Sequence, residues 1–295
     1  MDPRRRALLA FLATGGTVRP ALARNILLKK IPSTGEALPA IGVGTWQTFD
    51  VGSDKAARAQ LLEVVRLLEK NCVVDSSPMY GTSESVAGDL MAELKKPLFV
   101  ATKVWTSGRD AGVKQMETSF KRLRVERMDL MQVHNLVDVE THTKTLKEWK
   151  EKKRVRYIGI THYTSSAYAE VERALKTRQY DFLQINYSLG ERESEHRILE
   201  LAKDLRVAVI VNRPFAEGAL FRKTKNKPLP AWAAELGIAS WAQYFLKWIV
   251  SHPAVTCAIP GTGKPEHMKD NLAAGADPLP DPVARKKMAA YFDSL

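Results

Sequence analysis

Short apolar runs recur along the chain at a regular spacing, and this repetition constrains the fold more than any other feature of the sequence. The segments between the runs carry the spacing of amphipathic helices. Eight runs are present: 38–46, 71–76, 97–105, 127–135, 155–163, 180–188, 206–214 and 254–261. They are continuously apolar rather than alternating, which is typical of parallel strands covered on both faces. Eight strand–helix units in series predict a (β/α)8 TIM barrel, with an open doubly wound sheet as the alternative.

The segments around these strands complete the predicted domain. Two sets of apolar residues fall on single helical faces: Leu61, Val64, Val65 and Leu68, and Trp241, Tyr244, Phe245 and Trp248. Residues 25–40 predict a β-hairpin that turns at 32–35 and plugs the barrel floor. The Lys- and Pro-rich segment 221–232 predicts a surface excursion. Residues 25–295 are therefore expected to form a single barrel domain, since no second domain or repeat array is visible.

Composition limits the functions that this chain can have. Its 295 residues suit one α/β barrel, and no stretch approaches 18 consecutive apolar residues, so a membrane span is not expected. The formal net charge is +12. Residues 1–24 carry five arginines against Asp2, and the remaining excess is spread over helices of mixed sign such as 140–154. No basic run is interleaved with aromatics, which disfavours nucleic acid as a partner, whereas an anionic small molecule suits this charge.

The N-terminal 23 residues resemble a cleavable export signal of the twin-arginine type. Arg5 and Arg6 precede a mildly apolar stretch over 7–18, and a small-x-small pattern follows at 21–23. This order of features predicts export to the periplasm. The alternative is a basic tail on a cytoplasmic protein. Cys72 and Cys257 both lie in apolar runs and are expected to be buried thiols.

Four side chains with complementary chemistry stand at successive strand ends. Asp75 ends the second run, Tyr80 follows in the next loop, Lys103 ends the third run and His134 ends the fourth. Asp75 would hold Lys103 as an ammonium ion, and that ion would lower the pKa of the Tyr80 phenol from about 10. His134 would donate a hydrogen bond to a substrate oxygen. Such a group, without a nucleophile or a metal, suits carbonyl protonation coupled to hydride transfer.

At these residues the sequence resembles the aldo-keto reductases. The motifs that carry the resemblance lie in order at 42–46, 75–81, 100–105, 129–135, 159–163, 184–188 and 259–271. The resemblance implies that Asp75, Tyr80, Lys103 and His134 form a catalytic tetrad with Tyr80 as general acid. It also implies that NADPH, or alternatively NADH, lies extended across the barrel mouth.

The same resemblance implies a set of binding residues. Gly44, Thr45 and Trp46 would lie against the nicotinamide, and Gln184 would bind its carboxamide. The full set expected at the cofactor is Gly44, Thr45, Trp46, Asp75, Thr161, His162, Gln184, Arg213, Pro214, Phe215, Pro260, Gly261, Thr262, Lys264, His267 and Asn271. The residues expected to line the substrate pocket are Trp46, Met79 and Trp105.

The sequence departs from the family pattern at three places. Thr161 and His162 stand where Ser-Asn is usual. At the end of the seventh strand an aromatic commonly stacks on the nicotinamide, whereas here the run reads Asn212-Arg213-Pro214-Phe215. Arg213 is expected to meet a phosphate instead. His267 replaces a common arginine, with Lys264 as the evident substitute, so the preference for NADP over NAD is an expectation from the family. A short loop after the fourth strand and a short C-terminal tail predict an open pocket.

These features predict an NADPH-dependent reductase of aldehydes or ketones. The alternative is a catalytically feeble NADPH-binding sensor or accessory subunit with the same fold. The Gly42-x-Gly44 pair lacks the third glycine of a dinucleotide fingerprint, and the six histidines show no metal-binding spacing. The expected partner is a small carbonyl compound, without nucleic acid or metal, and the protein is expected to be a monomer or weak oligomer.

Overall fold

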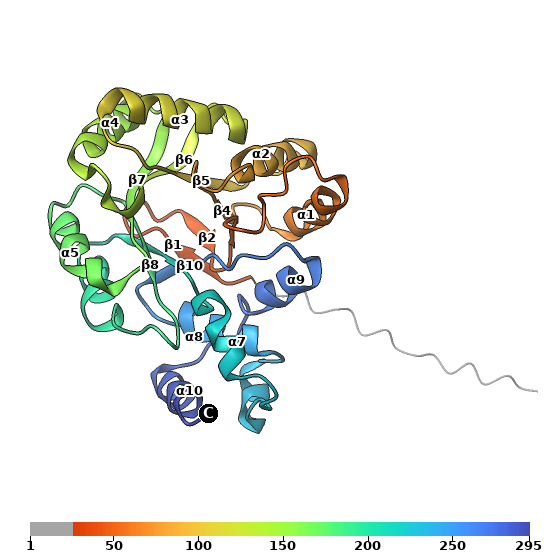
Figure 1. Ribbon diagram of the computed structural model, residues 1–295. Helices are drawn as coiled ribbons and strands as arrows, with labels where there is room; N and C mark the ends of the chain where they lie inside the picture. The colour runs from red at the N-terminus through yellow and green to blue at the C-terminus, as the bar shows by residue number, and fades with distance from the viewer. Residues whose placement is uncertain (1–25) are drawn as a thin grey trace, which may run out of the picture.

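The computed structural model describes residues 26–295 and shows a barrel of eight parallel strands. The strands follow one another around the sheet in chain order, as Figure 1 shows for those labelled there. Their bounds are β3 Val43–Gly44, β4 Val73–Asp75, β5 Phe99–Val104, β6 Met128–Val133, β7 Val155–Thr161, β8 Phe182–Asn186, β9 Ala208–Asn212 and β10 Val255–Ala258. Parallel bridges from Ile41 to Ala258 and from Gly44 to Gly261 join the first and last strands. The predicted barrel is therefore confirmed, and the open sheet is excluded.

Helices surround the strands on the outside of the barrel (Figure 1). Their bounds are α1 Lys55–Leu67, α2 Ser83–Leu94, α3 Arg109–Leu123, α4 Val139–Glu151, α5 Tyr168–Lys176, α6 Glu200–Asp204, α7 Ala219–Lys223, α8 Trp241–Val250, α9 Pro265–Ala273 and α10 Pro282–Asp293. Asp54 begins α1 by accepting hydrogen bonds from the backbone N–H groups of Ala56 and Ala57. The predicted faces of α1 and α8 are buried, apart from the partly exposed Trp241.

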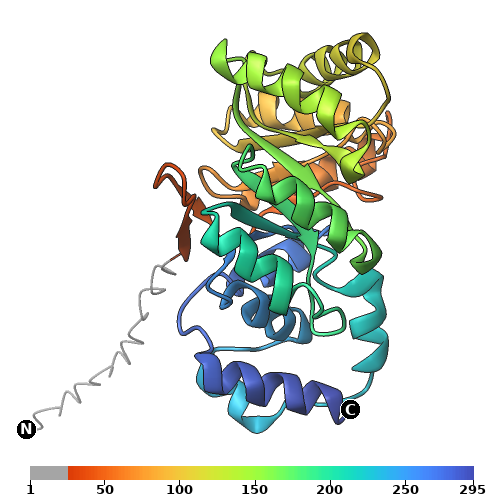
Figure 2. The same cartoon turned by 90° about the vertical axis from the view of Figure 1, so that its left-hand side faces the viewer.

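The predicted hairpin closes one end of the barrel. Strands β1 (Leu28–Lys30) and β2 (Ala37–Pro39) pair antiparallel, and Figure 2 shows them beyond one end of the barrel. Ile31 and Leu38 are fully buried and belong to the inner core with Phe99 and Phe182. This end is the floor, because the opposite end holds the carboxyl ends of the strands. We call that opposite end the mouth.

Gly42, just before β3, is explained by the close approach of its backbone to β4. A Cβ at Gly42 would lie 2.5 Å from the carbonyl oxygen of Val73. Any larger residue would push the first strand away from β4, so glycine is required there. The two glycines at 42 and 44 thus serve the packing of the first strand against its neighbours.

Three further sequence predictions concern the cysteines, membrane spans and the N-terminal segment. Cys72 and Cys257 are buried free thiols, as predicted. Among residues 26–295, none of the helices is long and apolar enough to cross a bilayer. The proposed export signal at 1–23 lies outside the described residues.

Candidate active site at the barrel mouth

The four predicted catalytic side chains lie together at the mouth. Lys103 is fully buried, and its Nζ lies 2.5 Å from Asp75 Oδ2. The same Nζ lies 5.2 Å from the centre of the Tyr80 ring. The rings of Tyr80 and His134 meet edge to face with centroids 6.0 Å apart. The ends of β4, β5 and β6 therefore bring an ion pair, a phenol and an imidazole into one cluster.

Asp75 accepts hydrogen bonds from two amides in addition to the bond from Lys103. Gln132 Nε2 and Gln184 Nε2 lie 3.1 and 2.9 Å from Asp75 Oδ1. Sequence reasoning missed Gln132, although a lone polar residue two positions before His134 in an apolar strand was a usable signal. Gly159 leaves room for it, because a Cβ there would lie 3.3 Å from Gln132 Cγ. These contacts hold the Asp75 carboxylate in one orientation beneath the site.

Opposing effects act on Lys103. Burial lowers the pKa of an ammonium, but attraction to Asp75 and to Tyr80 outweighs burial, so the pKa of Lys103 is raised. Its Nζ also donates a 2.7 Å hydrogen bond to the Ser76 carbonyl. Lys103 therefore stays charged in the interior of the barrel.

The predicted lowering of the Tyr80 pKa is wrong for this structure. Burial of the phenol raises its pKa, and the negative charge of Asp75 adds to this, so the opposing influence of Lys103 does not prevail. The sequence suggested the cation but not the degree of burial. Tyr80 consequently holds its proton at neutral pH, which is the state that a proton donor requires.

His134 is neutral at physiological pH. Burial lowers its pKa from 6.5 to about 3, with further contributions from the positive charges of Lys103 and His162. Its Nδ1 lies 3.2 Å from the hydroxyl of Ser77, a residue that sequence reasoning did not single out. A neutral imidazole carries one N–H, so it donates through one nitrogen only.

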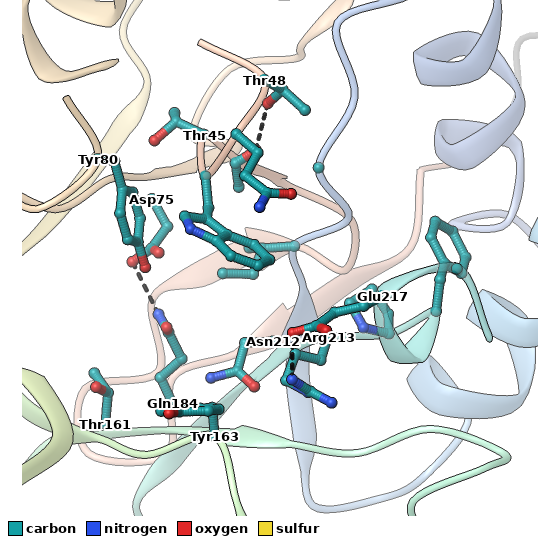
Figure 3. Close-up of a pocket in the computed structure, with 18 of the residues that line it drawn as sticks. Thr45, Thr48, Asp75, Tyr80, Thr161, Tyr163, Gln184, Asn212, Arg213 and Glu217 are labelled. Carbon is teal, nitrogen blue, oxygen red and sulfur yellow. Dashed lines mark hydrogen bonds and ion pairs between the residues drawn. The ribbon is translucent and has the colours of Figure 1, made fainter. Parts of the chain in front are cut away.

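The cluster opens into a cavity of about 650 Å³. Figure 3 shows Tyr80 and Asp75 on one side of this pocket and Arg213 and Glu217 on another. The volume lies within the range of small-molecule sites. The residues predicted to be catalytic or to bind the cofactor that line it are Gly44, Thr45, Trp46, Asp75, Tyr80, His134, Thr161, Gln184, Arg213, Pro214, Phe215 and Gly261.

The other predicted residues, including the fully buried Lys103, lie outside this lining. Met79 and Trp105 are 46% and 38% exposed, and the Trp105 ring lies 6.4 Å from that of His134. His162 stacks on Tyr163 beyond the end of β7. The remainder, Pro260, Thr262, Lys264, His267 and Asn271, lie after β10 and in α9. Lys264 and His267 are exposed there.

Arg213 is held by two carboxylates at the edge of the pocket. Its guanidinium lies 2.7 Å from Glu191 Oε1 and 2.5 Å from Glu217 Oε1, and the latter contact is drawn in Figure 3. The backbone is left-handed at Arg213, Ala216 and Glu217. A phosphate that approached Arg213 would therefore compete with these carboxylates, neither of which the sequence analysis had identified.

Asn212 is the first residue of the segment 212–215, in which the sequence departs from the family pattern. Its Nδ2 donates a 3.1 Å hydrogen bond to the His162 carbonyl, while its Oδ1 is buried and has no hydrogen-bond partner among the described residues. An unpaired buried acceptor in the wall of the pocket is costly unless a donor satisfies it. A nicotinamide dinucleotide, which carries an amide N–H₂ group, fits this wall in size and in chemistry.

Comparison with known proteins identifies one family. The sequence model described as the Aldo/keto reductase family matches residues 40–286. Methylglyoxal reductase YeaE of Escherichia coli K12 is 27% identical over 256 residues, covering 83% of this chain and 88% of that protein. Aldo-keto reductase YhdN of Bacillus subtilis is 24% identical over 287 residues, covering 81% of this chain and 86% of that protein.

Solved structures of the same family share the fold. An aldo/keto reductase from Klebsiella pneumoniae in complex with NADP and acetate superimposes with a TM-score of 0.74 at 23% identity, covering 90% of this chain and 95% of that chain. An aldo-keto reductase from the same organism in complex with NADPH gives a TM-score of 0.72 at 22% identity, with the same coverage.

Proposed function

Because the chain belongs to the aldo/keto reductase family, we propose that it reduces aldehydes or ketones to alcohols, with NADPH as hydride donor and Tyr80 as general acid. The observation that carries this proposal is the buried pair of Lys103 and Asp75 beneath Tyr80, beside a neutral His134. The chain is accordingly an oxidoreductase.

Each member of the cluster has a role that follows from its protonation state. Bound NADPH supplies a hydride to the carbonyl carbon of the substrate. Tyr80 gives its phenolic proton to the carbonyl oxygen as negative charge develops there. The Lys103 ammonium then stabilises the phenolate, which burial alone would disfavour. Asp75 keeps Lys103 charged, and the single N–H of His134 holds the substrate oxygen in place.

The same pocket and the residues after β10 provide a binding site for the dinucleotide. Gly44, Thr45 and Trp46 lie at the pocket and would contact the nicotinamide. Gln184 already donates its amide to Asp75, which leaves its side-chain oxygen to accept from the nicotinamide carboxamide. Exposed Lys264 and His267 at the start of α9 would meet the far end of the cofactor. NADPH rather than NADH is supported by the two Klebsiella pneumoniae complexes.

The pocket is open toward solvent and suits more than one carbonyl compound. Trp46, Met79 and Trp105 are each more than a third exposed around the mouth. After β6 the chain passes through the short turn His134–Leu136 directly into α4, so no long loop covers this side. The test panel therefore includes bulky aromatic aldehydes as well as methylglyoxal, the substrate named for the Escherichia coli relative.

Steady-state oxidation of NADPH across this panel tests the proposal. We expect turnover with at least one aldehyde or ketone and a stoichiometric alcohol product. A protein that binds NADPH but does not oxidise it with any member of the panel would be the sensor or accessory subunit and would contradict the proposal. NADH in place of NADPH, in matched reactions, measures the cofactor preference.

For the N-terminal segment we propose export through the twin-arginine-type motif at residues 5–6. Protein recovered from a periplasmic fraction should begin near residue 24 on N-terminal sequencing. Recovery from the cytoplasm alone, with residues 1–23 still attached, would contradict export.

A further inference from the structure

We propose that Ser77 is a positioning residue that determines which ring nitrogen of His134 carries the proton. The inference rests on the proposed function, in which His134 donates a hydrogen bond to the substrate oxygen. Ser77 lies two residues after Asp75, in the loop that joins β4 to α2. Ser77 is not among the residues that line the cavity. Within residues 26–295, its hydroxyl makes hydrogen bonds to His134 and to the Met79 backbone, and its carbonyl accepts from Tyr80.

The hydrogen bonds around the Ser77 hydroxyl fix its direction. The backbone N–H of Met79 donates to Ser77 Oγ at 3.3 Å. An amide N–H can only donate, so the hydroxyl proton remains to be given elsewhere. The other partner of Ser77 Oγ is His134 Nδ1 at 3.2 Å. Because Ser77 is fully buried, water does not offer an alternative acceptor, and the hydroxyl proton points to Nδ1.

This arrangement leaves His134 with one favourable tautomer. A neutral imidazole has one N–H and one lone pair. If Nδ1 accepts from Ser77, the proton must be on Nε2. Within residues 26–295, Nε2 of His134 makes no hydrogen bond to the protein, and His134 lines the cavity. The N–H is therefore available to a ligand oxygen.

The opposite tautomer is disfavoured at both nitrogens. A proton on Nδ1 would require the Ser77 hydroxyl to accept from both Met79 and His134, which would leave its own proton buried without an acceptor. At the same time Nε2 would present a lone pair to the carbonyl oxygen of a substrate. That contact is repulsive where a hydrogen bond is needed.

Ser77 also contacts the loop that carries Tyr80, the proposed proton donor. Its carbonyl oxygen accepts the backbone N–H of Tyr80 at 3.1 Å. One residue thus ties the loop that carries the phenol to the imidazole, whose ring stands nearly perpendicular to that of Tyr80 at 84°. The contact to Tyr80 uses the backbone only and persists in Ser77→Ala. This substitution consequently removes the hydroxyl's contacts to His134 and to the Met79 N–H, and it leaves the backbone contact to Tyr80 in place.

The direct test reads the tautomer by NMR, without catalysis. Protein labelled with ¹⁵N in histidine gives long-range ¹H–¹⁵N correlations that separate protonated from unprotonated ring nitrogens, and His134→Gln assigns the signal by its disappearance. We expect wild type and Ser77→Thr, which keeps the hydroxyl, to carry the proton on Nε2. Ser77→Ala should show a mixture or a proton on Nδ1. Ser194→Ala, which removes another fully buried serine hydroxyl, should match wild type.

Two results would overturn the inference. One is a wild-type protein in which the assigned His134 signal shows the proton on Nδ1. The other is a Ser77→Ala protein that keeps a pure Nε2–H tautomer.

Kinetics give an independent readout of the same contact. In Ser77→Ala, kcat/KM for a carbonyl substrate should fall about 10-fold, with the Kd for NADP⁺ unchanged and with recovery in Ser77→Thr. Unchanged kcat/KM in Ser77→Ala would count against a positioning role. A wild-type protein with the expected tautomer that reduces no carbonyl would contradict the proposed function and leave the role of Ser77 supported.

Discussion

Two buried lysines show how the mouth of the barrel differs from its floor. Lys103 at the mouth faces the Asp75 carboxylate, and its pKa is raised. Lys247 in α8 is also buried, but its Nζ donates only to the carbonyls of Ala276 and Pro278, and burial lowers its pKa. Backbone carbonyls suffice to hold a chain segment in place. A carboxylate partner, in contrast, keeps a buried lysine protonated, so that its positive charge acts on the neighbouring phenol.

Left-handed residues other than glycine divide between the two ends in the same way, apart from Asn226 in the turn after α7. On the floor side they end or follow helices, at Asn71, Lys95, Arg124, Lys153, Arg178 and Arg206, where such a residue is an ordinary way to stop a helix. At the mouth they cluster in the loops around the cavity, at Gln47, Asn135, Leu136, Asp138, Arg213, Ala216 and Glu217. Unfavourable backbone conformations of this kind tend to collect at functional sites. The distribution of left-handed residues therefore agrees with the proposed site at the mouth.

Two tyrosines provide the strongest test of this division. Tyr80→Phe at the mouth should lower turnover by about 10²- to 10⁴-fold, because the proposed proton donor is lost, while the Kd for NADPH changes little. Tyr157→Phe at the floor removes a 2.6 Å hydrogen bond to Glu36. It should cost about 0.5–1.5 kcal/mol of unfolding free energy and leave kcat unchanged. Steady-state kinetics and urea unfolding measure both variants. A loss of turnover in Tyr157→Phe would show that the floor also affects the reaction.

The lysines themselves should differ in their effect on stability. Lys103→Met leaves Asp75 as an uncompensated buried charge, and removal of one partner from such a pair costs about 3–5 kcal/mol. Lys247→Met leaves only carbonyls unsatisfied, at about 1–3 kcal/mol. Urea unfolding at neutral pH gives both values. Equal losses of unfolding free energy in the two variants would show that Asp75 does not make Lys103 more important for stability than Lys247.

Acid should weaken the protein through a histidine at each end. The pKa values of His134 and His252 are lowered from 6.5 to about 3 and about 4, in both cases first by burial. The unfolded chain therefore binds more protons below pH 6.5, so the stability that each neutral histidine provides is present above 6.5 and is lost as the pH falls. The slope for each is at most about 1.4 kcal/mol per pH unit.

Substitution should assign these two contributions. Urea unfolding at pH values from 7 to 3 should show a shallower acid dependence in His134→Gln and in His252→Gln than in wild type. Between pH 4 and 3 only the contribution of His134 should remain. An acid dependence identical to wild type in His134→Gln would mean that this imidazole is not held neutral.

Two arginines, each between two carboxylates, give the smallest expected difference. Arg156 at the floor contacts Glu36 and Asp129, and Arg213 at the mouth contacts Glu191 and Glu217. Glu217→Gln should leave Arg213 paired with Glu191 alone. A phosphate would then compete with one carboxylate instead of two, and NADP⁺ binding should tighten by up to about 5-fold, since exposed pairs contribute about 0.2–1 kcal/mol. Glu36→Gln should leave that Kd unchanged. Calorimetry at low and high salt checks this, and weaker binding in Glu217→Gln would contradict it.

The barrel and the tetrad positions followed from features that are local in sequence. Continuous apolar runs mark buried parallel strands, and polar residues at their ends mark the mouth, so the sequence alone places Asp75, Lys103 and His134 at one rim. The hairpin floor followed from a turn signal at 32–35. The barrel, the tetrad positions and the hairpin can each be predicted from a pattern of residues that are close together in the sequence.

The remaining features depend on distances across the fold. The rise in the Tyr80 pKa follows from burial by several elements, which no single segment reveals. The carboxylates on Arg213 come from separate loops after β8 and β9. Ser77 meets His134 only because β4 and β6 end at the same rim. Such contacts require the three-dimensional arrangement of the loops.

A crystal structure with bound NADP⁺ would show whether Tyr80 and His134 face the nicotinamide. We expect the nicotinamide in the cavity beside Trp46, with room for one ligand oxygen about 2.6–3.2 Å from both Tyr80 Oη and His134 Nε2. The nicotinamide C4 should then lie about 3–3.5 Å from the carbon that bears this oxygen. A nicotinamide bound outside the mouth, or a Tyr80 hydroxyl turned away from it, would refute the proposed roles of Tyr80 and His134.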